Sequence, residues 1–474
     1  MLKNSNTYII TIVFSIGLYA IYLLILKGGI LPALLFACLP GLVLLTAQFC
    51  RQQYYFYLFF IINYFISGVD RYIPLKIGII MLGLTVSLVG LLLIKSAFQT
   101  YEWRRSLNVL TVSWGIWLIY CLFELFNPLA VSEAWMIAIN GYAFFPLISA
   151  ILLPLLFTRF KHFQRLLILW AILSILAALK GFWQKNHGFD SAELHWLFVD
   201  GGARTHVIYY GIRYFSFLTD AANVGISMGI SLTVFGISGF FVKKKWVKSL
   251  FWFTALVSAY GLLISGTRSA IVVPIVALCA YTILCRNLKN LAITGTLLVG
   301  LLLFLTQTTI GNSNYIVRRV RSTFDQEDAS YKVRTSNKEK MIPLMKNKPF
   351  GVGLGLSGGR MSRFGINNEL SQYPPDSLLT MYWLETGITG LILYLSLLLI
   401  IFIRASYIAM FIVKDKQLKN ILFSIIASLA GTFVAAYAND ITTYSNGILI
   451  SILFVFLFIA PYYDKELTKN ETAT

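Results

Sequence analysis

Long apolar segments recur along the whole chain, and they restrict its fold more than any other feature. Fourteen segments are apolar enough to enter a membrane: 8–26, 30–49, 54–67, 77–94, 107–127, 136–157, 164–182, 218–241, 249–265, 269–284, 290–307, 378–403, 419–438 and 443–462. About 18 apolar residues suffice for a helix to cross the hydrocarbon core, whereas a transmembrane β-barrel would show shorter, alternating segments. With 58% hydrophobic and 12% charged residues, the chain also has too few polar residues to cover a soluble protein of this length.

The predicted fold is therefore an all-α, polytopic membrane bundle of about 12–14 transmembrane helices. The range reflects that 54–67 is short for a span and that only a few residues join 249–265 to 269–284. Two long loops, 183–217 and 308–377, interrupt the series of spans, and the second is predicted to be partly helical. Functional residues are expected in these loops and at their edges.

Lysine and arginine residues in the short connections predict the orientation of the bundle, because they collect in short cytoplasmic loops. With the N-terminus inside, the cytoplasmic connections include the basic groups at 243–248 and 404–419. The short outer turns then carry few basic residues, namely Lys27, Arg71, Lys76 and Arg268. We predict cytoplasmic termini and two outer loops. The net charge of +19 reflects this distribution and attraction to anionic lipids, and no nucleic-acid-binding pattern accompanies it.

The loop 308–377 contains two recognisable segments. The first, SYKVRTSNKEKMIPLMKNKPF, predicts an amphipathic helix that starts near Ser330 and is stopped by Pro349. The second, GVGLGLSGG at 351–359, lacks the preceding strand and the terminal GK[ST] of a phosphate-binding loop. We interpret it as a flexible re-entry of the chain into the bilayer.

Three arginines stand out on the predicted outer side. Arg213 precedes the span 218–241, Arg268 lies between two apolar segments, and Arg334 belongs to the predicted loop helix. An arginine among apolar spans needs an anionic partner or access to water. Taken singly, the three are also explained as an interfacial residue, a topology anchor and a solvated helix charge. Together they predict a site for a doubly charged phosphate group, because a guanidinium binds its oxygens bidentately.

The segment DSLLTMYWLETGITG at 376–390 resembles the signature of bacterial O-antigen ligases and the related O-antigen and capsule polymerases. That signature is a His, then Asn, Ser or Gln, then nine residues, then Gly-x-x-Gly. Ser377 fills the second position, and Gly387 and Gly390 are the glycine pair. The segments SGTRSA, RYFSFLTDAANVG and VRTSNKEKMIPLMKNKPFGVGLG are similar to other parts of the same family, so the resemblance covers 205–395.

This resemblance implies a multi-span glycosyltransferase of the GT-C type. Such a protein transfers a glycan from a polyprenyl (undecaprenyl) diphosphate carrier to a sugar hydroxyl, at the periplasmic face of the bacterial inner membrane, without metal or other cofactor. The implied partners are the carrier-linked glycan, membrane lipids and an acceptor, which is lipid A core or a second carrier-linked repeat unit. It also suggests a division into N-terminal helices at 1–204, a catalytic region at 205–395 and C-terminal helices with a short tail at 396–474.

The resemblance also assigns roles to individual residues. Asp376 stands where the family has its histidine, and as an ionised carboxylate it can accept the proton of the acceptor hydroxyl. A helix cap is the alternative for Asp376, and the two roles are compatible. Arg268 and Arg334 are predicted as catalytic residues that neutralise the diphosphate. The predicted substrate-binding residues are Arg213, Ser377, Asn223, Asp220, Arg318, Arg319 and Arg321.

Several of these assignments have alternatives. Asp220 and Asn223 are equally well explained by capping or packing. Glu385 is a weaker candidate, interpreted as an exposed interfacial residue before Gly387. The four histidines lack the spacing of a metal site and are interpreted as surface residues, although His206 is a possible acceptor ligand; they are His162, His187, His195 and His206.

The choice of activity also stays open at this point. The basic cluster Arg318, Arg319 and Arg321 offers room for the diphosphate of a second carrier, which favours a polymerase. The nine-residue spacing to Gly-x-x-Gly is the ligase form. A flippase for lipid-linked oligosaccharide is the alternative of another class, but it would need charges that reach both membrane faces and internal repeats, and the sequence shows neither.

Overall fold

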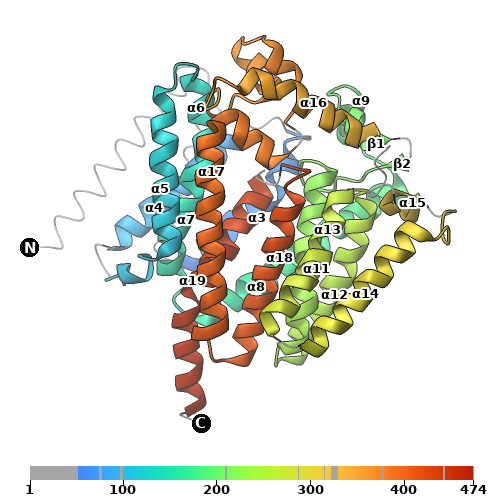
Figure 1. Ribbon diagram of the computed structural model, residues 1–474. Helices are drawn as coiled ribbons and strands as arrows, with labels where there is room; N and C mark the ends of the chain where they lie inside the picture. The colour runs from blue at the N-terminus through green and yellow to red at the C-terminus, as the bar shows by residue number, and fades with distance from the viewer. Residues whose placement is uncertain are drawn as a thin grey trace, which may run out of the picture. The chain divides into compact units, whose positions relative to one another are not determined.

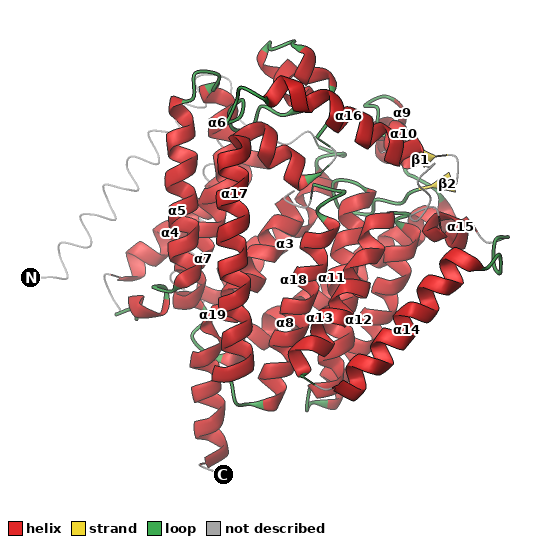
Figure 2. Ribbon diagram, viewed as in Figure 1, coloured by secondary structure: helices red, strands yellow, loops and turns green. Residues whose placement is uncertain are grey.

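The computed structural model describes residues 52–73, 77–96, 100–208, 211–286, 288–313, 315–321, 329–375, 377–440 and 444–472 (Figure 1). The described helices are α3 (Gln52–Val69), α4 (Ile77–Ser96), α5 (Val109–Phe123), α6 (Ser132–Ile139), α7 (Phe145–Leu156), α8 (Phe160–His187), α9 (Ser191–Phe198), α10 (Ala203–His206), α11 (Ala221–Phe241), α12 (Lys245–Ile264), α13 (Arg268–Cys285), α14 (Leu288–Gln307), α15 (Tyr315–Arg321), α16 (Ala329–Met345), α17 (Leu378–Tyr407), α18 (Lys416–Ala435) and α19 (Tyr444–Thr472). Two strands of two residues, β1 (Val207–Ile208) and β2 (Gly211–Ile212), pair antiparallel (Figure 2).

The helical prediction is confirmed. In the described part of the chain, nine helices are long and apolar enough to cross a membrane. The predicted spans 8–26 and 30–49 lie outside the described residues. The predicted span 136–157 is built from α6 and α7, joined by the π-helical turn Asn140–Phe144 into one apolar rod from Ser132 to Leu156.

The chain forms two compact units. The first comprises Met1–Ile62 with Lys76–Glu102, and its described helices are α4 and most of α3. The second comprises Asn63–Leu75 with Trp103–Thr474 and contains every functional residue predicted above that the structure describes. Within this second unit, α11 packs against α12, α13 and α18, while α5 packs against α7 and α17.

Glycines on α11 allow it to approach α13 closely. A Cβ added at Gly225 would come within 2.8 Å of the Ala270 side chain, and one at Gly229 within 3.1 Å of Val273. Small residues four apart let two membrane helices pack backbone to backbone. This contact brings the N-terminal ends of α11 and α13 together, which places the loop before α11 beside Arg268.

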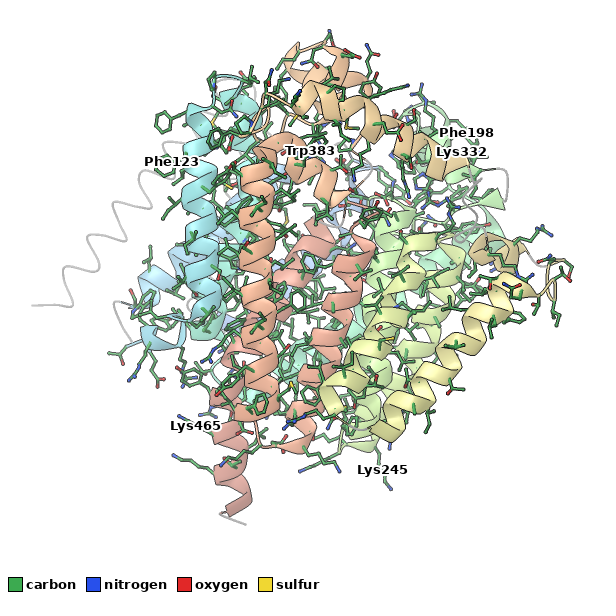
Figure 3. All side chains as sticks on the ribbon, viewed as in Figure 1. Phe123, Phe198, Lys245, Lys332, Trp383 and Lys465 are labelled. Atoms are coloured by element: carbon green, nitrogen blue, oxygen red, sulfur yellow. The ribbon has the colours of Figure 1, made fainter. Side chains whose placement is uncertain are left out.

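The two ends of the second unit differ in the residues they carry. Figure 3 shows Lys245 and Lys465 at one end, and Lys332, Phe198 and Trp383 toward the other. The helices α9 and α16 and the strand pair also lie at that second end (Figure 1). The long loops therefore gather at the end opposite the lysines that were predicted to be cytoplasmic.

Candidate functional site

Arg213, in the loop that leads from β2 to α11, is held by three hydrogen bonds. Its guanidinium donates to the Thr267 hydroxyl and to the Thr205 carbonyl, each at 2.9 Å, and to the Ser265 carbonyl at 3.4 Å. Thr267 directly precedes Arg268, the first residue of α13. The hydrogen bonds therefore fix Arg213 next to the start of α13.

The charges around Arg213 show which predicted residues lie near it. Burial lowers the pKa of the Arg213 guanidinium, and the positive charges of Arg268 and Arg334 lower it further, whereas Asp220 opposes them. An arginine remains a cation through such a shift because its ordinary pKa is above 12. Arg268 and Arg334 thus lie near enough to Arg213 to act on its charge; we call these three residues the arginine cluster, with Asp220 as a neighbouring carboxylate.

α16 carries Arg334 into this cluster, and the predicted loop helix is confirmed. Met341 and Met345 of α16 are buried against Leu356 and Leu384 in one apolar cluster. Arg334 lies seven residues before Met341, which along an α-helix is roughly 10 Å toward the N-terminus. The C-terminal end of α16 is therefore fixed by apolar packing, and its basic N-terminal part, with Arg334, extends from that end.

His206 links the segment before Arg213 to the start of α11 by hydrogen bonds. Its Nε2 accepts a hydrogen bond from the Ala221 amide at 3.1 Å, so Nδ1 carries the proton and donates to the Gly202 carbonyl at 2.9 Å. Burial lowers the pKa of His206 to about 4, which keeps the ring neutral. The prediction of a surface histidine was wrong for His206, which is 2% exposed, and for His162, which is also buried.

Arg71 holds the loop 213–220 by hydrogen bonds to its backbone. Its guanidinium donates to three carbonyl oxygens of the loop, those of Ser216, Leu218 and Thr219, at 3.1, 2.5 and 2.8 Å. It also lies over the ring of Phe215 at 4.4 Å. From the sequence, Arg71 is predicted only as a basic residue of an outer turn, because its partners lie about 145 residues further along the chain.

Asp220 and Asn223 make the contacts of capping residues. The Asp220 carboxylate accepts from the amide and from the side chain of Asn223, each at 2.8 Å, at the N-terminus of α11. The Asn223 side-chain oxygen accepts from Asn446 of α19 at 2.9 Å. These contacts fit the capping alternative, while the carboxylate of Asp220 also balances part of the charge on Arg213.

The start of α17 lies at the same end. Ser377 is its N-cap, and the Ser377 hydroxyl accepts from the Thr380 amide at 3.0 Å. Asp376 lies outside the described residues, so its role stays a prediction. The amide of Leu378 donates to the carbonyl of Asn439 at 3.2 Å, and the Asn439 side chain donates to the hydroxyl of Ser269. Asn439 thereby joins the first turns of α17 and α13.

Glu385 differs from its prediction. It is fully buried rather than exposed. Its carboxylate accepts from the Gly355 amide at 2.7 Å and from the Ser357 hydroxyl at 2.5 Å, and its carbonyl accepts from the Gly353 amide at 3.0 Å. Residues 351–358 are all buried, so the prediction of a flexible re-entry was wrong as well. The glycine-rich segment is a packed loop built around a carboxylate.

Gly387 makes this packing possible. Its backbone has φ 67° and ψ −173°, a combination essentially restricted to glycine. A Cβ at this position would overlap the carbonyl of Pro349. The first glycine of the Gly-x-x-Gly pair therefore both breaks α17 and lets the loop before 351 approach the helix backbone.

Arg360 is a further charged residue beside α17. Its guanidinium lies 3.7 Å from a carboxylate oxygen of Glu385 and 3.3 Å from one of Asp440. Burial by itself would lower the pKa of Arg360, but Glu385 and Asp440 raise it above the ordinary value. No local pattern predicts this arrangement, because Asp440 lies 80 residues from Arg360 and Glu385 belongs to an apolar helix.

The arginines of α15 hold the turn before that helix. Arg318 donates to the Asn312 carbonyl at 2.6 Å, and Arg321 donates to the Ile310 carbonyl at 2.8 Å. The side chain of Arg319 lies outside the described residues. Because α15 packs against α13, this basic helix belongs to the same part of the unit as Arg268.

Comparison with known proteins identifies the central part of this region. Curated proteins give no match to the chain. Residues 253–395 match the family described as O-antigen ligase. That stretch includes Arg268, Arg334 and Arg360 and the loop packed on Glu385, whereas Arg213 and Asp440 lie on either side of it. Residues 253–395 of this multi-pass membrane protein are thus similar to the O-antigen ligase family.

Proposed function

We propose that the protein is a membrane glycosyltransferase of O-antigen or related surface polysaccharide assembly. It moves a glycan from an undecaprenyl diphosphate carrier to a sugar hydroxyl, at the periplasmic face of the bacterial inner membrane. The observation that carries this proposal is the arginine cluster at the end where α17 begins. Three guanidinium groups act on one another there, and a guanidinium binds phosphate oxygens bidentately, which suits a diphosphate.

The chemistry follows from where charge develops. The bond between the anomeric carbon and the diphosphate oxygen breaks, and negative charge grows on the leaving diphosphate. Fixed guanidinium groups stabilise that charge without having to reorganise. Asp376, next to the N-cap Ser377, takes the proton of the acceptor hydroxyl as its oxygen bonds to the anomeric carbon from the opposite face. The sugar is therefore transferred with inversion.

Placement in the membrane is part of the proposal. The glycosyl transfer occurs in the region 205–395, preceded by the N-terminal helices of 1–204, whose first spans face the lipid, and followed by the C-terminal helices of 396–474. Both termini are cytoplasmic. The separation of Lys245 and Lys465 from α16 supports this orientation, because lysine-rich ends remain in the cytoplasm (Figure 3).

We rank polymerase ahead of ligase. A polymerase binds two carrier diphosphates, and the basic sequence of α15, with Arg318, Arg319 and Arg321, supports a second phosphate-binding surface on a helix that packs against α13. The spacing to Gly387 supports the ligase alternative, with lipid A core as acceptor. A glycolipid gel of a strain that lacks the protein decides between them. Core that carries one repeat unit supports the polymerase, and bare core with polymer retained on the carrier supports the ligase.

Transfer by the purified protein in liposomes tests the shared activity. The donor is carrier-linked glycan extracted from the host and loaded into the outer leaflet. Replacing Arg268 by Ala should reduce the transfer rate by about 100-fold or more, the usual cost of removing one donor to a developing oxyanion. The matched control is Arg363→Ala, which removes an exposed arginine of the loop 308–377.

Two results contradict the proposal. If Arg268→Ala transfers glycan at the rate of the unmodified protein, the arginine cluster does not bind the leaving diphosphate. If the unmodified protein moves carrier-linked glycan across the bilayer without forming a glycosidic bond, the protein is a flippase.

A further inference from the structure

Arg360 and Asp440 form a charged pair beside the first turn of α17. Besides the 3.3 Å contact with Asp440, the Arg360 guanidinium lies 3.4 Å from the sulfur of Met381, one turn into that helix. Asn439, adjacent to Asp440, accepts from the amide of Leu378. The pair therefore lies close to Ser377, which follows the proposed proton acceptor in the sequence.

Glu385, the other carboxylate beside Arg360, cannot reach a substrate. Its side chain is 0% exposed, while the side chains of Arg360 and Asp440 are 43% and 23% exposed. The Glu385 carboxylate is fixed by the Gly355 amide and the Ser357 hydroxyl, and Arg360 follows Ser357 by three residues. Glu385 thus sets both the loop that carries Arg360 and the direction of its guanidinium.

Charge distinguishes this group from the arginine cluster. The guanidinium of Arg360 lies between two carboxylates, which offset its charge. An arginine–carboxylate pair offers donors and acceptors side by side. Sugar hydroxyls both donate and accept hydrogen bonds, so a neutral polyhydroxyl ligand suits this pair.

We propose that Arg360 and Asp440 bind hydroxyl groups of the acceptor sugar and that Glu385 is a positioning residue for Arg360. The inference rests on the proposed function and adds the acceptor subsite to it. The acceptor, rather than the donor sugar, is assigned because its attacking hydroxyl must lie beside the proton acceptor at the start of α17. The donor diphosphate binds at the arginine cluster on α13 and α16.

The test is a comparison of two KM values in the liposome transfer assay. The donor is the carrier-linked repeat unit from the host, and its outermost acceptor hydroxyl is blocked by methylation. The acceptor is a fluorescent short-chain carrier-linked repeat unit or lipid A core from the same host, whichever the unmodified protein uses. Each substrate is titrated at saturating concentration of the other.

The variants Asp440→Asn and Arg360→Lys should each raise the KM for the acceptor by about 10-fold or more, because each loses a charged hydrogen bond. The KM for the donor should stay within twofold of the original. Glu385→Gln should shift the acceptor KM in the same direction by a smaller factor. The matched controls Asp200→Asn and Arg363→Lys, which change exposed residues of the outer loops, should leave both values unchanged.

A binding measurement separates the subsite from a loss of fold. Inorganic pyrophosphate should raise the unfolding temperature of Asp440→Asn and Arg360→Lys as much as that of the original protein, and it should not protect Arg213→Lys with Arg268→Ala. Acceptor KM values within twofold of the original in both variants overturn the inference, and so does an equal rise of both KM values. Unmodified protein that transfers no glycan overturns the proposed function, a result seen before any variant is measured.

Discussion

Replacing Gly387 by Ala tests whether the kink of α17 is required for the packed glycine-rich loop. A non-glycine residue in the backbone conformation of Gly387 costs about 1–3 kcal/mol. The added Cβ also displaces the Pro349 carbonyl and with it the chain that follows. Two backbone hydrogen bonds of that chain, from Val352 to Leu384 and from Gly353 to Glu385, are then lost at about 1 kcal/mol each. The expected loss of unfolding free energy is about 3–5 kcal/mol.

Gly115→Ala is the matched control. Gly115 lies inside α5, and a Cβ at this position would contact nothing within 4 Å. Alanine is the better helix former by about 1 kcal/mol, so this variant should be as stable as the original protein or slightly more stable. Denaturant unfolding of the detergent-solubilised proteins, followed by tryptophan fluorescence, measures both changes.

Comparing the two variants shows which result would contradict a structural role for Gly387. If Gly387→Ala unfolds at the same denaturant concentration as Gly115→Ala, neither the backbone strain nor the close approach to Pro349 contributes to stability. Gly387 would then not be what holds the loop 351–358 in place.

Three further predictions follow from the loop 213–220 and from the packing of α11. Arg71→Ala should lose about 5 kcal/mol of unfolding free energy or more, because three charged hydrogen bonds disappear. Arg71→Lys should regain only part of this stability, and full stability of the lysine variant would show that the guanidinium fork is not needed. Between pH 6.5 and 4 the unfolded chain binds a proton at His206 that the folded protein does not bind, so the unfolding free energy should fall by about 3 kcal/mol as the pH drops through this range. His206→Gln keeps an acceptor for the Ala221 amide, and its thermal unfolding should depend less on pH. The same pH dependence in this variant and in the original protein would show that His206 is not the group that titrates. Gly225→Ala should separate α11 from α13 and lower the unfolding temperature. In Gly236→Ala, on the same helix, the new Cβ meets only an ordinary 3.8 Å contact, so the unfolding temperature should stay the same. Equal unfolding temperatures of the two variants would exclude close packing at Gly225.

Helix positions were predictable because the apolar length of a segment sets where it can span a membrane. The predicted spans 218–241 and 269–284 correspond to α11 and α13 within a few residues. Their first residues follow Asp220 and Thr267, which precede apolar runs as helix-start residues do. Arg213 and Arg268 stood out for the same reason, since each borders a long apolar segment, whereas Arg334 lies in the polar loop helix.

The group around Glu385 was not predictable from local pattern. An acidic residue before a glycine at the end of an apolar stretch usually faces water, whereas Glu385 finds amide and hydroxyl donors in a segment about 30 residues earlier. The glycines of 351–358 suggested mobility, yet here they allow close approach of two backbones, as at Gly351, where a Cβ would lie 2.6 Å from the Glu385 carbonyl. Sequence spacing carries no sign of such pairing.

The order in which the chain is synthesised gives the bonds of Arg213 a consequence for biogenesis. Arg71, which holds the loop 213–220, is made before that loop, but Thr267 follows Arg213 by 54 residues. Until α12 and α13 have entered the membrane, Arg213 has its Thr205 contact without its partners at the start of α13. The arginine cluster can therefore form only late in membrane insertion, after α16 has also emerged, so the newly made N-terminal half cannot yet bind a lipid diphosphate through all three arginines.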